Sequence, residues 1–147
     1  MPASTGKTGR GVTLAISGGE SPPDFVTIAN LATISRTGRS ADEIDFTHLA
    51  SEGGYREFRQ GFKDGGEIGF DMHFNPTEPS HIDLLQRFLD GQVIDWRIDY
   101  SGQGWDMYEV GKGYVSNPGD ITINVDDPIG GSGTIRVTGA TAYEAIP

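Results

Sequence analysis

The amino-acid sequence predicts a mainly β protein, a β-sandwich or small barrel of about eight strands with one short α-helix and a long loop rich in glycine and aromatic residues. Most segments alternate apolar and polar residues with a period of two, and one alone shows helical spacing. The 22 glycines and 8 prolines of this 147-residue chain punctuate these segments. The length fits one domain, which we place at residues 11–140, between arms at residues 1–10 and 141–147.

The first predicted strand covers residues 11–17, where Val12, Leu14 and Ile16 share one face. The second, residues 25–35, is rich in β-branched residues and has an irregularity near Asn30. The other predicted strands are residues 43–49, 67–75, 93–100, 105–115, 121–125 and 133–139.

The one predicted helix covers residues 80–89. Ser80 is its expected N-cap and Gly91 its C-terminal stop. Ile82, Leu85 and Leu89 are spaced so that they form one apolar helix face.

Two predicted strands carry acidic residues on one face. Glu43 and Asp45 share the polar face of the strand at residues 43–49, and Glu67 and Asp71 share that of the strand at residues 67–75. The opposite faces are apolar and are expected to point into the core; they carry Ile44, Phe46, Ile68, Phe70, Met72 and Phe74. The two strands flank the aromatic loop, which allows them to pair antiparallel.

The aromatic loop, residues 50–66, combines five glycines with Tyr55, Phe58 and Phe62. Glycine permits an unusual backbone path, and the aromatics are too apolar for a free loop. Such a loop is a folded hairpin tip or a contact surface.

Charge excludes several functions. The formal net charge of −10 opposes tight binding to nucleic-acid phosphates and to anionic membranes. Cysteine is absent, which excludes disulfides and thiolate sites, and no apolar run is long enough to span a membrane. The first ten residues lack the apolar core of a signal peptide, so we expect synthesis in the cytoplasm.

Candidate cofactor and catalytic motifs are weak. Residues 6–8, Gly-Lys-Thr, resemble the end of a phosphate-binding loop, but Met1 stands where that motif needs glycine. His73 and His81 are interpreted as ordinary histidines, and Asp126 and Asp127 as solvated turn residues without calcium-loop spacing. We therefore expect no cofactor, no metal and no catalytic residue.

One long block of sequence, residues 44–76, resembles the major tail tube protein family of long-tailed, lambda-type bacteriophages. Its first part is Gly-Gly-Tyr-Arg-Glu-Phe at residues 53–58, and its second is Gly-Phe-Lys-Asp-Gly-Gly-Glu at residues 61–67. The short helix and the Trp-Arg-Ile of residues 96–98 fit the same order, and the resemblance covers roughly residues 25–140.

The resemblance implies a structural virion protein and no enzyme. Rings of six subunits would stack into a tube whose acidic lumen conducts double-stranded DNA during ejection without specific binding. Further expected partners are the tape measure, tail terminator and tail tip proteins. The resemblance does not decide whether the particle is an infectious phage or a gene transfer agent. It also does not decide whether the tail is contractile or non-contractile.

Two sets of residues would then act in the tube. The first is the expected inter-ring stacking surface: Gly53, Gly54, Tyr55, Arg56, Phe58, Arg59, Phe62 and Lys63. We expect its cations to pair with acids across the contact between rings. The second set is the expected lumen surface: Glu43, Asp45, Glu67 and Asp71.

Two alternatives remain open at this point. A β-sandwich binding module for carbohydrate or adhesion would use exposed aromatic residues such as Tyr55, Trp105 and Tyr108. A hydrolase would need two carboxylates in a cleft, and nothing singles out such a pair among the 21 acidic residues.

Overall fold

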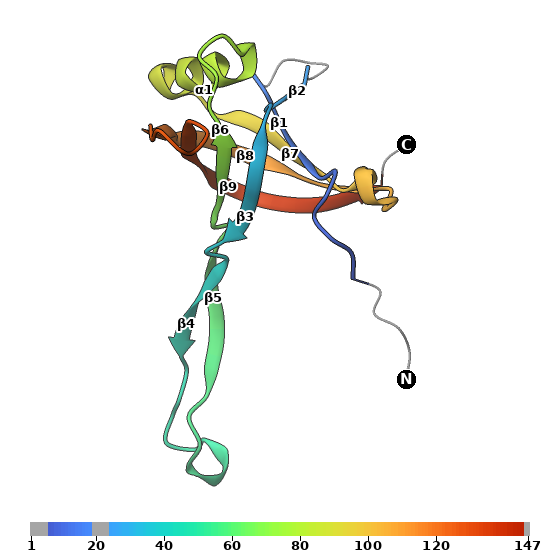
Figure 1. Ribbon diagram of the computed structural model, residues 1–147. Helices are drawn as coiled ribbons and strands as arrows, with labels where there is room; N and C mark the ends of the chain where they lie inside the picture. Colours follow the sequence, from blue (N-terminus) through green and yellow to red (C-terminus); the bar gives the residue numbers. More distant parts are fainter. Residues whose placement is uncertain (1–5, 19–23, 146–147) are drawn as a thin grey trace.

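The computed structural model describes residues 6–18 and 24–145 as a curled antiparallel sheet, one helix and a projecting hairpin (Figure 1). Residues 1–5 of the predicted N-terminal arm and residues 146–147 of the C-terminal arm lie outside the described part. The strands are β1 (Thr13–Ser17), β2 (Val26–Thr27), β3 (Leu31–Thr37), β4 (Ser40–Asp45), β5 (Phe58–Asp64), β6 (Glu67–His73), β7 (Ile94–Asp99), β8 (Met107–Thr122) and β9 (Gly130–Ala145). The helices are α1 (Pro79–Asp90) and two short 3₁₀ turns, η1 (Glu52–Gly54) and η2 (Ser101–Gln103).

Seven strands form the curled sheet in the order β2-β1-β7-β8-β9-β6-β3, and β4 and β5 form a separate two-stranded sheet. The mainly β architecture with one α-helix is confirmed. The predicted strands at residues 105–115 and 121–125 are one strand, β8, because the register shift between Asn117 and Asp120 bends the ladder with β9 without ending it.

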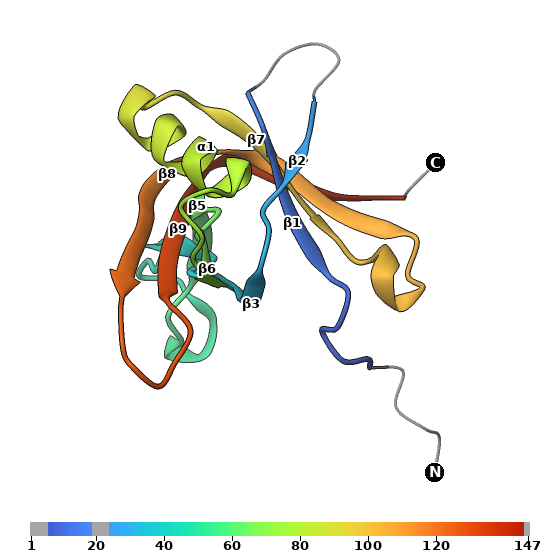
Figure 2. The same cartoon turned by 45° about the horizontal axis from the view of Figure 1, so that its top comes forward.

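The core lies on one face of the curled sheet, which Figure 2 shows wrapping below α1. Ile68, Phe70 and Met72 on β6 are buried, as the alternation predicts, and Phe74 is partly buried. Trp96 at the centre is fully buried, and its Nε1 donates to the Lys112 carbonyl at 3.2 Å. The buried apolar set also includes Leu14, Ile16, Ile28, Leu84, Ile94, Ile98, Val115, Ile135 and Val137.

The predicted strand at residues 25–35 is interrupted where expected. Asn30 has a left-handed backbone (φ 59°), so β2 ends before it and β3 begins after it. β2 pairs with β1, whereas β3 pairs with β6 at the opposite edge of the sheet. The irregularity therefore moves the chain between the two edges.

The start of α1 differs from the prediction. Glu78 is the N-cap residue and Pro79 opens the helix, so the expected capping by Ser80 is wrong. Ser80 Oγ instead accepts the Ala29 amide at 3.1 Å. His81 Nδ1 accepts the Asn75 amide, so its Nε2 carries the proton and donates to the Ala29 carbonyl at 2.7 Å. These bonds turn the polar residues inward.

The ends of the predicted domain have local partners. Lys7 Nζ donates to the Gln103 carbonyl at 2.6 Å and lies over the Trp105 ring. At the other end, β9 continues to Ala145, which pairs with Met107, so the segment assigned to the C-terminal arm begins as strand.

Candidate assembly surfaces

The first candidate surface is the hairpin formed by β4, β5 and the connection between them, residues 40–64. It projects from the curled sheet as a thin finger (Figure 1). Its two strands pair only with each other, and residues 58–64 of the predicted aromatic loop are a strand. The predicted pairing of residues 43–49 with residues 67–75 is therefore wrong. β4 pairs with the nearer β5, whereas β6 pairs with β3 and β9.

Apolar side chains of the hairpin are exposed. Ile44 and Phe46, expected in the core, are 45% and 48% exposed because no other layer of the described structure covers this hairpin. Phe62 on β5 is 89% exposed, and Leu49 in the connection is fully exposed. Tyr55 and Phe58 are exposed too. Several large apolar side chains left exposed on one projecting element indicate an interaction site.

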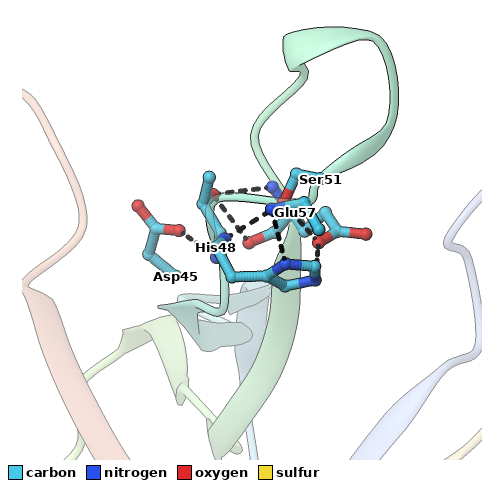
Figure 3. A network of polar contacts seen from close by, with 6 residues as sticks. Asp45, His48, Ser51 and Glu57 are labelled. Atoms are coloured by element: carbon cyan, nitrogen blue, oxygen red, sulfur yellow. Dashed lines mark hydrogen bonds and ion pairs between the residues drawn. The ribbon is translucent and has the colours of Figure 1, made fainter.

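The tip of the hairpin, residues 46–57, is held by a polar network (Figure 3). Glu57 Oε2 accepts Ser51 Oγ at 2.7 Å and lies 3.2 Å from His48 Nε2. Asp45 Oδ1 accepts the Thr47 amide at 2.8 Å. Hydrogen bonds from the Thr47 side chain and backbone, helped by Arg56, lower the pKa of Asp45. The network stabilises one tip conformation although the tip lacks a core.

The expected stacking residues have definite places in this hairpin. Gly53 and Gly54 both have positive φ, at 64° and 71°, and form the η1 turn. Arg56 Nη1 lies 3.4 Å from Asp45 Oδ2, and the Arg59 guanidinium lies 4.8 Å from the Phe46 ring centre. Two of the three cations thus have partners within the hairpin. Lys63 lies on β5, opposite Ala41.

The base of the hairpin is clamped on both sides. On the β5 side, Arg136 Nη2 lies 2.6 Å from Asp64 Oδ2, and its Nη1 donates to the Gly66 carbonyl. The Gly66 amide donates to Asp64 Oδ1 at 2.8 Å; this bond, followed by Arg136, lowers the pKa of Asp64. Gly66 has φ +82°, and a Cβ there would lie 2.1 Å from the Thr37 carbonyl oxygen. Only glycine fits at this point, where the turn after β5 crosses the turn between β3 and β4.

On the β4 side, the clamp is a buried carboxylate that sequence reasoning missed. Glu109 on β8 is fully buried; its Oε2 lies 3.3 Å from Arg36 Nε and 3.6 Å from Arg39 Nη2. Arg39 also donates to the Tyr143 hydroxyl at 3.3 Å. Because Arg39 stands between β3 and β4, this cluster ties the hairpin base to the sheet. Alternation with Tyr108 and Val110 would place Glu109 on an exposed polar face, so the sequence carried no signal for its burial.

The four predicted lumen acids divide into two pairs in different sheets. Glu67 and Asp71 lie on the polar face of β6, where Asp71 Oδ1 accepts Ser132 Oγ at 2.6 Å. Glu43 and Asp45 lie on β4, in the projecting hairpin. All four are exposed. The structure therefore does not bring them together as one strand pair.

The second candidate surface is the exposed face of α1. Leu84 is buried together with Ser80 and His81, because the bonds to Ala29 turn that side toward the sheet. The stripe that defines the predicted apolar face is on the other side: Ile82 is 47%, Leu85 45% and Leu89 66% exposed. This face has no covering element in the described part of the chain.

Other site types find little support in the residues described. None of their His, Asp and Glu side chains gather in a group of three or more able to hold a metal ion. The aromatics considered for a binding module are not brought together: Tyr55 is at the hairpin tip, whereas Trp105 and Tyr108 lie beside η2 (Figures 1 and 2). Within residues 6–18 and 24–145, no helix has the length and apolar character to cross a membrane.

Comparison with known protein families gives a match for this chain. Residues 10–144 match the family described as lambda phage tail tube protein, TTP. No curated protein matches the chain in sequence.

Solved structures show the same fold. A chain from the tail of an empty gene transfer agent particle, refined with C6 symmetry, is 22% identical, with a TM-score of 0.74 over 95% of this chain and all of that chain. The SPP1 tail tube protein is 12% identical, with a TM-score of 0.68 over 95% of this chain and 80% of that one. A chain of the sheath-tube complex of an extracellular contractile injection system is 13% identical, with a TM-score of 0.65 over 92% and 88%.

Proposed function

The chain belongs to the lambda phage tail tube protein family, and from this premise we propose that six copies form a ring and that rings stack head to tail into the tube of a phage or gene transfer agent tail. The protein is a structural component of a tail tube, and the virion is its location. Repeating a heterologous contact generates an open filament. The C6 symmetry of the similar gene transfer agent tail supports a ring of six.

One observation carries the stacking proposal: the hairpin projects from the sheet, and the other described residues leave its apolar side chains uncovered. Its base is clamped by Arg136 and Glu109, and its tip by the Glu57 network. A rigid projection loses little conformational entropy on binding. Tyr55, Phe58 and Phe62 are then the anchors of the contact between rings.

The test is assembly of the purified protein, followed by negative-stain imaging and sedimentation. We expect the wild type to form rings and tubes as its concentration rises. Phe62→Ala should remain a folded subunit and lose tubes, because buried aromatic anchors typically contribute about 2 kcal/mol or more. Val125→Ala, an equally exposed apolar side chain in the β8–β9 turn, is the matched control. A wild type that stays monomeric at high concentration would contradict the proposal.

The proposal extends to the lumen. Glu67 and Asp71 lie on an exposed polar face with Ser132, and Arg136, the register partner of Glu67, is already bound to Asp64. A lumen lined by this face would repel phosphate, so double-stranded DNA would slide along it. Glu43 and Asp45 extend the proposed acidic lining along the hairpin.

The lumen proposal is tested with particles that carry charge-reversal variants. Glu67→Lys should still assemble but slow DNA ejection, most strongly at low salt. Asp126→Lys makes the same charge change in the β8–β9 turn and should leave ejection unaltered. Glu43→Lys tests the hairpin separately, whereas Asp45 is unsuitable because it holds the tip. Unchanged ejection in both lumen variants would exclude the assignment.

The remaining parts of the proposal follow from the tube role. We propose that the tape measure protein lies inside the tube during assembly and that terminator and tip proteins bind its two ends. Enzymatic activity has no place in this function. The similar chains come from the SPP1 tail tube and from gene transfer agent particles, so the tail of a phage or of a gene transfer agent fits the proposal.

A further inference from the structure

The apolar face of α1, defined as Ile82, Leu85 and Leu89, needs a partner that residues 6–18 and 24–145 do not supply. The three side chains follow helical spacing, which in a single-chain protein points to the core. Here they are 45–66% exposed, because Ser80 and His81 hold the opposite side of the helix against the sheet. The hairpin has the same property, since Ile44 and Phe46 alternate like core residues yet lie outside.

We propose that the apolar face of α1 is the docking site for the hairpin tip of a second copy of this chain in the adjacent ring. The inference rests on the stacking proposed above and deepens it by naming the acceptor surface. A head-to-tail contact requires two different patches on one subunit that fit each other.

Position supports this pairing. Figure 1 shows α1 at one end of the molecule and the hairpin leaving from the opposite end. When copies are stacked along the direction of the hairpin, its tip points toward the α1 end of the next copy.

Apolar burial, and not charge, favours the contact. The tip, residues 46–57, carries two acidic residues and one basic residue. Residues 78–90, which include α1, carry three acidic residues and one basic residue, a net charge of −2. Both sides are therefore acidic, and association rests on the apolar side chains that each side leaves exposed.

A competing acceptor is the β8–β9 turn, where Ile123 and Val125 are exposed beside Asp126 and Asp127. This turn points sideways from the sheet, across the direction of the hairpin (Figure 1). Its direction makes it less suited than α1 to receive the hairpin tip of a copy in the adjacent ring. The cross-linking test below therefore also measures contact between the hairpin tip and the β8–β9 turn.

Thiol cross-linking provides the test, because the wild type contains no cysteine. Leu49→Cys in the tip is combined with Leu89→Cys on α1, tubes are formed, and a short bis-maleimide is added. Denaturing gels should show a ladder of chains that extends beyond six subunits, since links between rings continue along the tube. Links within a ring cannot exceed the number of its members.

Three controls make the result specific. Each single-cysteine variant should give no ladder, and a mixture of the two should stop at dimers. The pair Leu49→Cys with Val125→Cys should stay unlinked; a long ladder from this pair instead would assign the tip to the β8–β9 turn and overturn the proposal.

An independent variant measures the energy of the contact. Leu89→Ser should keep the wild-type unfolding transition but raise the protein concentration needed for tubes by at least about tenfold. If the wild type forms no tubes, the stacking proposal itself fails and this inference with it. If tubes form but Leu49→Cys/Leu89→Cys gives no chains longer than six and Leu89→Ser assembles normally, only the docking site is wrong.

Discussion

The curled sheet and the projecting hairpin are built from the same kind of strand. β6 alternates apolar and polar residues and buries Ile68, Phe70 and Met72, whereas residues 43–46, at the end of β4, alternate in the same way and leave Ile44 and Phe46 exposed. The two strands differ in which strands lie beside them. β6 lies between β3 and β9 in a sheet that curls around a core, while β4 meets only β5. Alternation therefore identifies a face that needs a partner, and the partner can belong to another subunit.

The largest expected effect concerns the buried carboxylate that joins the two regions. Glu109→Ala should lower the free energy of unfolding by about 3–5 kcal/mol, because the buried Arg36 guanidinium loses its counter-charge. Denaturant titration followed by tryptophan fluorescence measures the loss. The double variant Arg36→Leu/Glu109→Leu removes both charges and should recover more than half of it. A loss below about 1 kcal/mol in the single variant, the scale of exposed ion pairs, would show that the cluster contributes little.

The comparison itself is tested by two apolar truncations. Ile68→Ala in the sheet should cost about 2–5 kcal/mol of unfolding free energy, because it leaves a cavity in the core. Phe62→Ala in the hairpin should stay within about 0.5 kcal/mol of wild type, because its ring is exposed in the subunit. The free energies of unfolding of both variants are measured in the same denaturant series and compared. Equal losses would place Phe62 in the subunit core.

The close approach of Gly66 to Thr37 at the hairpin base predicts an intermediate loss of stability when Gly66 is replaced. Gly66→Ala should destabilise the protein by about 1–3 kcal/mol, because alanine disfavours the positive φ and its Cβ collides with the Thr37 carbonyl. Gly54→Ala also has positive φ but meets open space, and is the control that isolates the collision. Thermal unfolding of the two variants separates strain from steric conflict. Equal melting temperatures would contradict the role given to the crossing.

The smallest expected effect is a local loss of stability at low pH. The pKa values of Asp45 and Asp64 are lowered in the folded state, so their contribution to stability is complete above the ordinary value of 3.8 and is lost as pH falls below it. Hydrogen exchange should then accelerate first at the Thr47 and Gly66 amides, before the amides of β6. Asp45→Asn and Asp64→Asn should remove this pH dependence at their own sites. Simultaneous loss of protection in β6 would contradict a local effect.

Much of the molecule could be predicted from sequence because the signals were local. Alternation located the strand β6 and its buried face, and Gly91 ended α1 with the left-handed backbone expected of it. Asn30 marked the break between β2 and β3. The block at residues 53–67 indicated the family that residues 10–144 then matched.

The tertiary structure alone decided which partner each face meets. Strand β5 was hidden in a glycine-rich segment, so the pairing of β4 with β6 was a wrong choice between two neighbours. Helical spacing located an apolar stripe on α1, but the bonds of Ser80 and His81 to Ala29 turned that stripe outward. Periodicity reports that one face of a strand or helix is apolar, whereas long-range hydrogen bonds and packing decide whether the chain itself covers it.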